Sequence, residues 1–149
     1  MCFQFFGRSA RYYAPDGLVR ATPGSVGVDL RACLEVEEAI PPGERRVIGS
    51  GIGIEPRQPG IAGFVFSRSG LGGLRGIAVA QGVGVIDPDY RGEIRVPLLN
   101  TGRETYKVQP GERIAQLAFL PFLQPVFREI PRLGATERGG GGFGHTGRG

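Results

Sequence analysis

The segment GVIDPDYRGEI, residues 84–94, holds the residues best suited to chemistry in this chain. An apolar run ends at Ile86, and Asp87 and Asp89 follow on either side of a proline. A turn here would present a carboxylate at the rim of a sheet, where acidic side-chain chemistry would be accessible. Taken alone, such a segment is more often an ordinary turn, because Asp and Pro are frequent turn residues.

A second segment, FSRSGLGG at residues 66–73, has the composition of an anion-binding turn. Arg68 and Ser69 come directly after a predicted strand, and the glycines that follow let backbone amides approach an anion closely. Arginine offers a charged fork of N–H donors that matches phosphate, and serine offers a hydroxyl. By itself this pattern is also compatible with a plain loop.

The chain ends in ERGGGGFGHTGRG, residues 137–149, which holds one Phe and the only His between arginines. Such a segment predicts either a solvated tail or an arm that closes over a phosphorylated ligand. Its formal GxGxxG match is no dinucleotide fingerprint, because no strand precedes it and no helix can follow it. We expect a domain at residues 1–133 and an arm at residues 134–149.

Several other kinds of site are excluded by composition. The only lysine, Lys107, lies in ETYKVQ, so no Walker-type phosphate loop is present. One His, with Cys2 and Cys33 at a spacing that fits no zinc site, cannot build a zinc centre or a Ser-His-Asp triad. We interpret the two cysteines as reduced thiols of a cytoplasmic protein.

The 149 residues are 40% hydrophobic, enough for one packed domain. A net charge of +4 spread over scattered basic residues favours a small anion over nucleic acid as the partner. The apolar stretch IAQLAFLPFL is interrupted by Gln116 and Pro121, so we expect no membrane contact.

Short runs rich in Val, Ile and Phe alternate with turn signals such as PPGE, RQPG and QPGE, a pattern typical of an all-β sandwich or barrel. We expect a short helical turn in SGLGGLRG, and an irregular or strand conformation in RACLEVEEAI. The predicted strands are VGVDLRA, RRVIGSGIGI, AGFVFS, GIAVA, EIRVPLLN, ETYKV and RIAQLAFLPF.

Five segments, in order, resemble the motifs of the trimeric deoxyuridine triphosphatase (dUTPase) family of bacterial type: GSVGVDLRA, RSGL, GVIDPDYRGEI, GERIAQLAF and RGGGGFGHTG. The resemblance covers nearly the whole chain. It implies a distorted jelly-roll β-barrel with a flexible glycine-rich C-terminal arm. It also implies hydrolysis of dUTP to dUMP and pyrophosphate by water attack on the α-phosphorus, which limits uracil in DNA and supplies dUMP for thymidylate synthesis.

The same resemblance assigns roles in the reaction. Asp87 would orient and deprotonate the attacking water, whereas Asp89 would remain a turn residue. Tyr90 would pack against the sugar and reject a 2'-hydroxyl, with an ordinary core tyrosine as the alternative. Uracil would lie against the strand at residues 81–86, with Gln81, Gly82, Val85 and Ile86 as the expected contacts. Gly82 and Gly84 would let the base approach the backbone closely.

At the phosphate end, the resemblance implies contacts from Arg68, Ser69, Gly70 and Gln116. Magnesium would be held mainly by the triphosphate, with Asp29 giving indirect support or serving only the structure. In the arm, Arg138 would reach the terminal phosphate and Phe143 would stack on uracil. Further nucleotide contacts would come from Gly144, His145 and Thr146.

The family is trimeric, so the resemblance implies a homotrimer with three shared sites, each closed by the arm of a further subunit. Three alternatives remain open at this point. A dCTP deaminase shares the fold but lacks the Phe-containing fifth motif, and a nucleotide-sensing protein would bind without turnover. The tail could instead bind single-stranded nucleic acid, although it offers only one aromatic residue.

Overall fold

The computed structural model describes residues 1–13 and 17–142, which form eleven strands, one α-helix and one 3-10 helix. The predicted all-β class is therefore confirmed. The bounds are β1 (Cys2–Phe5), η1 (Ser9–Tyr12), β2 (Val28–Arg31), β3 (Glu38–Ile40), β4 (Arg45–Gly49), β5 (Ile52–Glu55), β6 (Ile61–Phe66), α1 (Ser69–Arg75), β7 (Ile77–Val79), β8 (Val83–Ile86), β9 (Arg95–Asn100), β10 (Tyr106–Val108) and β11 (Arg113–Pro121).

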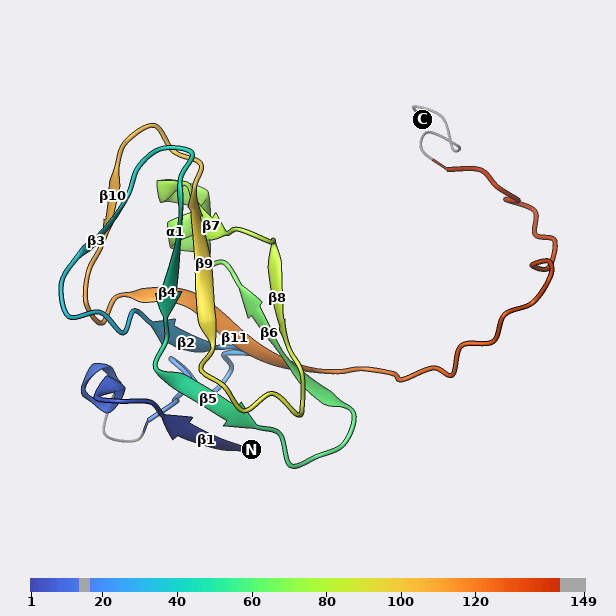
Figure 1. The fold of residues 1–149 in the computed structure, drawn as a ribbon, viewed down its shortest axis with the longest axis horizontal. Helices are drawn as coiled ribbons and strands as arrows, with labels where there is room; N and C mark the ends of the chain where they lie inside the picture. Colours follow the sequence, from blue (N-terminus) through green and yellow to red (C-terminus); the bar gives the residue numbers. More distant parts are fainter. Residues whose placement is uncertain (14–16, 143–149) are drawn as a thin grey trace.

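The strands form a jelly-roll-like arrangement of antiparallel sheets (Figure 1). One sheet has the order β2-β11-β6-β8 and another the order β4-β9-β7, while β1 pairs with β5 and β3 with β10. Their inward faces meet in one apolar cluster that includes Leu30 and Leu117 from the first sheet and Val96 and Leu98 from the second. In β2 and β9 buried residues alternate with more exposed ones, which marks the buried face of these two strands.

The run RRVIGSGIGI is two strands rather than the single strand predicted. The chain leaves β4 at Ser50 and enters β5, which belongs to a different pair of strands. Gly51 has a φ of 67°, and a Cβ there would lie 2.0 Å from the Cβ of Ser9. Glycine is required for this left-handed turn, which moves the chain between sheets.

The N-terminal strand β1 was not predicted from the sequence. Its four residues pair with β5, and Phe5 packs against Tyr13 with ring centroids 5.6 Å apart. A run this short carries too little alternation to be recognised by pattern alone.

The two predictions for the weaker segments are confirmed. SGLGGLRG forms α1 and its C-cap, Gly76, which has a φ of 69°. RACLEVEEAI begins with the last residue of β2 and is then irregular up to β3 near its end. In the ranges 1–13 and 17–142, no helix is long and apolar enough to cross a membrane.

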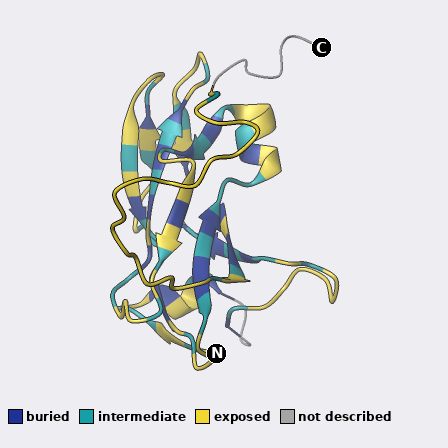
Figure 2. Cartoon of the chain, turned by 90° about the vertical axis from the view of Figure 1, so that its right-hand side faces the viewer, coloured by how far each residue is buried: buried dark blue, intermediate teal, exposed yellow. Residues whose placement is uncertain are grey.

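The segment after β11 leaves the body of the molecule as an extended strand-free chain, up to residue 142 (Figure 1). Its surface is exposed along almost its whole length (Figure 2). Leu123, Val126 and Phe127 are 92%, 97% and 91% exposed. β11 ends at Pro121, ahead of the predicted boundary at residue 134, so apolar side chains lie in water before the glycine-rich part begins.

Tyr13 gives the folded state a measurable pH dependence. Its side chain is 8% exposed, its hydroxyl donates to the Ser50 carbonyl at 2.7 Å, and it accepts from the Arg31 amide at 3.1 Å. Burial raises the pKa of this hydroxyl from 10.0 to about 12. A raised pKa stabilises the fold below pH 10, and this stabilisation, about 2–3 kcal/mol, is lost as the pH rises to 12.

We therefore expect the free energy of unfolding to fall between pH 10 and 12, and to fall less steeply in Tyr13→Phe, which has no hydroxyl to ionise. Urea unfolding followed by circular dichroism at several pH values measures both slopes. Tyr106, whose pKa is also raised to about 12 by burial, titrates in both proteins and cancels in the comparison. Equal slopes would contradict the assignment to Tyr13.

Candidate active site

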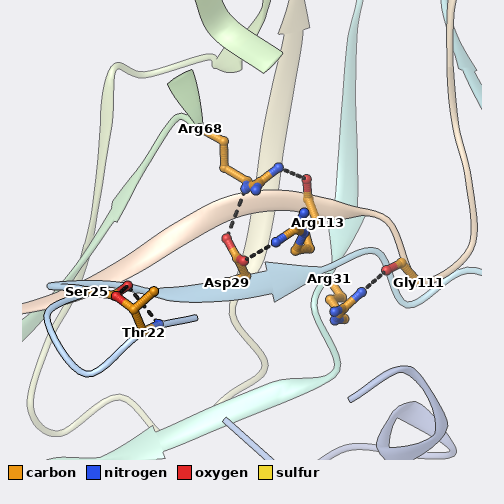
Figure 3. A network of polar contacts seen from close by, with 7 residues as sticks. All are labelled: Thr22, Ser25, Asp29, Arg31, Arg68, Gly111 and Arg113. Atoms are coloured by element: carbon orange, nitrogen blue, oxygen red, sulfur yellow. Dashed lines mark hydrogen bonds and ion pairs between the residues drawn. The ribbon is translucent and has the colours of Figure 1, made fainter. Parts of the chain in front are cut away.

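Asp29 on β2 lies between two arginine side chains (Figure 3). Its Oδ1 accepts a hydrogen bond from Arg68 Nε at 2.9 Å, and its Oδ2 accepts one from Arg113 Nη1 at 3.2 Å. Arg68 Nη1 also approaches the Arg113 carbonyl oxygen at 3.4 Å. One carboxylate shared by two guanidinium groups leaves an excess of positive charge, which suits an anionic ligand.

Strand register brings Gln116 to the same place. In β11, Gln116 lies opposite Asp29 of β2 on one side and opposite Phe66 of β6 on the other. Gln116 is exposed, whereas its neighbours Ala115 and Leu117 are buried, so the amide faces away from the core. Asp29, Arg68 and Gln116 are therefore gathered on one surface.

Ser69 and Gly70 open α1 directly after Arg68, and both are exposed. Ser67, in contrast, has a structural contact: its hydroxyl accepts from the Val79 amide at 2.8 Å and ties this turn to β7. Sequence reasoning did not single out Arg113. The sequence hint to its role was its place at the start of a predicted strand, within the segment GERIAQLAF.

β8 is an edge strand, since it pairs with β6 at the end of its sheet. The outer backbone edge of such a strand is open to a ligand or another chain. Gln81 and Gly82 lie in the turn before β8, and Gly82 has a φ of 80°. The Gln81 amide lies over the strand, because its Nε2 is 3.3 Å from where a Cβ on Gly84 would be.

A shallow pocket of about 220 Å³ lies at the end of β8. Asp87 is exposed at its rim, and the Tyr90 amide donates to the Asp87 carbonyl at 3.1 Å, which closes the turn. Arg91 Nη1 donates to the Pro88 carbonyl at 2.6 Å and supports the same turn. The pocket is lined by Val85, Ile86, Asp87, Tyr90, Glu93, Ile94 and Arg95.

Asp87 and Arg68 lie at opposite ends of the β6–β8 ladder. Asp87 follows Ile86, which pairs with Gly63, whereas Arg68 comes after Phe66, which pairs with Val83. With a rise of about 3.3 Å per residue, the two sites are on the order of 20 Å apart along the strands. Figure 1 shows α1 and the β8–β9 loop at the two ends of this ladder. One chain therefore does not bring the carboxylate and the arginine pair together.

The arm residues are placed only in part. Arg138 Nε donates to the Gly141 carbonyl at 2.9 Å within the arm itself. Phe143, Gly144, His145 and Thr146 lie outside the described residues. In the part of the chain that the structure describes, no three His, Cys, Asp or Glu side chains gather into a metal site.

Comparison with known proteins identifies the family. The family model described as dUTPase matches residues 16–147. A curated relative from Hydrogenovibrio crunogenus, named deoxyuridine 5'-triphosphate nucleotidohydrolase, is 50% identical over 127 residues. The match covers 85% of this chain and 83% of that relative.

Solved structures share the fold. The crystal structure of dUTPase from Streptococcus mutans has a TM-score of 0.72 and 26% identity, and the match covers 85% of this chain and 100% of that one. The dUTPase of Staphylococcus bacteriophage 80alpha, solved with dUpNHpp, has a TM-score of 0.84 and 21% identity, over 98% and 97% of the two chains. The family model, the curated relative and the shared fold together show that this chain belongs to the dUTPase family and is a dUTP diphosphatase, which hydrolyses dUTP to dUMP and pyrophosphate.

Proposed function

We propose that Asp87 is the general base, which orients and deprotonates the water that attacks the α-phosphorus of dUTP. The observation that carries this assignment is the exposed carboxylate at the rim of a pocket that Tyr90 and the end of β8 also line. Transfer of the water proton to the carboxylate creates the nucleophile, and pyrophosphate leaves as the α–β phosphoanhydride bond breaks. Removal of dUTP would limit uracil in DNA and supply dUMP. We place this reaction in the cytoplasm, because the free thiols of Cys2 and Cys33 fit a reducing compartment.

The pocket and the β8 edge bind the nucleoside in this proposal. Open backbone donors and acceptors at an edge strand can imitate a base-pairing partner of uracil. Gln81, Gly82, Val85 and Ile86 belong to this strand and the turn before it. The ring of Tyr90 packs against the deoxyribose, where a 2'-hydroxyl would collide with it.

The residues around Asp29 bind the triphosphate in this proposal. Arg68, Ser69, Gly70 and Gln116 supply a charged fork, a hydroxyl, a backbone amide and a side-chain amide to phosphate oxygens. The substrate is the magnesium complex of dUTP, in which the ion neutralises phosphate charge. Both carboxylate oxygens of Asp29 accept hydrogen bonds from arginines, so Asp29 acts on this end through Arg68 and Arg113.

A complete site forms between subunits of a homotrimer. The first support is the separation of Asp87 from Arg68, which one nucleotide can bridge only if two chains contribute. The second is the exposed apolar arm: leaving Leu123, Val126 and Phe127 in water forgoes roughly 1.5–3 kcal/mol for each side chain. Docking this segment on another subunit recovers that free energy.

The arm of a further subunit then closes each site over the nucleotide. Arg138 binds the terminal phosphate and Phe143 stacks on uracil. Gly144, His145 and Thr146 complete the contacts along the nucleotide.

Pyrophosphate release measured with each nucleoside triphosphate and magnesium tests the reaction and its specificity together, with dUTP as the expected substrate.

We expect Asp87→Asn to lower turnover by about 100-fold or more while dUTP binding is kept, because the amide cannot take the water proton. Single-turnover pyrophosphate release and calorimetric binding measure the two effects. Asp89→Asn is the matched control, since Asp89 is exposed in the same turn but does not line the pocket. Near-normal turnover in Asp87→Asn would remove this residue from the mechanism.

We expect Asp29→Asn to raise the KM for dUTP about tenfold or more, since a neutral amide cannot hold both arginines by charged hydrogen bonds. Steady-state kinetics across a range of dUTP concentrations measures this change. Glu37→Gln is the control: it breaks an exposed ion pair with Lys107 (2.6 Å), in which neither residue has a proposed role in catalysis. Equal KM values in Asp29→Asn and the wild type would contradict the positioning role.

The composite site predicts complementation. A chain truncated after Thr136 and a full-length Asp87→Asn chain should each be nearly inactive. When they are unfolded together and refolded, mixed trimers should regain activity, because Asp87 of one chain can meet the arm of another. Separately refolded proteins are the control. If native mass spectrometry finds mixed trimers that remain inactive, the arm does not serve a neighbouring subunit's site.

A further inference from the structure

Gly92 makes room for the ring of Tyr90. A Cβ on Gly92 would lie 2.4 Å from Tyr90 Oη, 2.5 Å from Cζ and 2.9 Å from Cε2. No side-chain carbon is accommodated at such distances, so the ring occupies this position only because residue 92 is a glycine. The Tyr90 hydroxyl donates to the Glu93 carbonyl at 2.9 Å, which holds the ring against the backbone of the same turn.

The backbone that follows Gly92 is hydrogen-bonded to the chain at the start of β5, which restrains its movement. The Gly92 carbonyl oxygen lies 3.1 Å from where a Cβ on Gly53 of β5 would be, so these two segments of the chain lie close together. Just after it, the Glu93 carboxylate accepts from the Gly51 amide at 2.7 Å, and the Ile94 amide donates to the Ile52 carbonyl at 2.8 Å. The free end of the Tyr90 side chain is therefore the part that must yield.

The glycine is not required by its own backbone conformation. Gly92 is absent from the positive-φ glycines of the described residues, so alanine can adopt its backbone angles. Tyr90 is partly exposed, which gives its ring somewhere to go. A methyl group at residue 92 should thus displace the ring and leave the fold in place.

We propose that Gly92 is a positioning residue for sugar specificity: it sets the place of the Tyr90 ring in the pocket beside Asp87 and Ile86. The inference rests on the proposed function, in which that ring excludes a 2'-hydroxyl. With the ring displaced, the deoxyribose loses its packing surface and the space for a 2'-hydroxyl opens. The preference for dUTP over UTP then falls.

The test compares Gly92→Ala with Gly73→Ala, a control at an exposed position on α1 where an added Cβ meets open space. Tyrosine rings labelled with ¹³C give NMR signals for the four tyrosines, and Tyr90→Phe identifies those of Tyr90. We expect the Tyr90 ring signals to move in Gly92→Ala only. The ratio of kcat/KM for dUTP to that for UTP should fall about tenfold, mainly through the KM for dUTP.

A double-mutant cycle separates this role from general damage to the turn. In a Tyr90→Ala background, Gly92→Ala should leave the dUTP to UTP ratio unchanged, since no ring remains to be displaced. Unmoved Tyr90 signals, or moved signals with an unchanged ratio, would overturn the inference. If the wild type itself hydrolysed UTP as well as dUTP, the proposed role of Tyr90 would fail too, so the two failures are distinguishable.

Discussion

The register of β11 is the constraint on which the candidate site depends. This strand pairs with β2 and β6, and its register sets Gln116 opposite both Asp29 and Phe66. Arg68 follows Phe66 and reaches the Asp29 carboxylate from there. A slip of one residue would turn Gln116 into the core and the buried Leu117 out of it, so burial of the apolar face holds the register in place.

The antiparallel ladder has a second consequence, which concerns charge. It holds the Asp87 carboxylate and the Arg68 guanidinium at opposite ends of β6 and β8. In the proposed trimer, separation within a chain lets the acid of one subunit and the arginines of another act on one nucleotide.

Much of the secondary structure could be predicted from residue patterns. Short apolar runs between turn signals anticipated most of the strands, and the short helical turn expected in SGLGGLRG is α1. The prediction of a single strand at RRVIGSGIGI was wrong, because an apolar run does not indicate which sheet each of its residues belongs to. That change of sheet occurs at Gly51, whose conformation and close approach to Ser9 involve a residue far away in the sequence.

The sequence by itself determined the family, the all-β class and the residue types of the site, since five ordered motifs span the chain. Tertiary structure alone decided how these residues meet. It placed Arg113 beside Asp29, separated Asp87 from Arg68, and pressed Gly92 between the Tyr90 ring and Gly53. Motifs give the types of residues and their order along the chain. The distances between motifs depend on strand register and close packing, and these arise only when segments far apart in the sequence pair with one another.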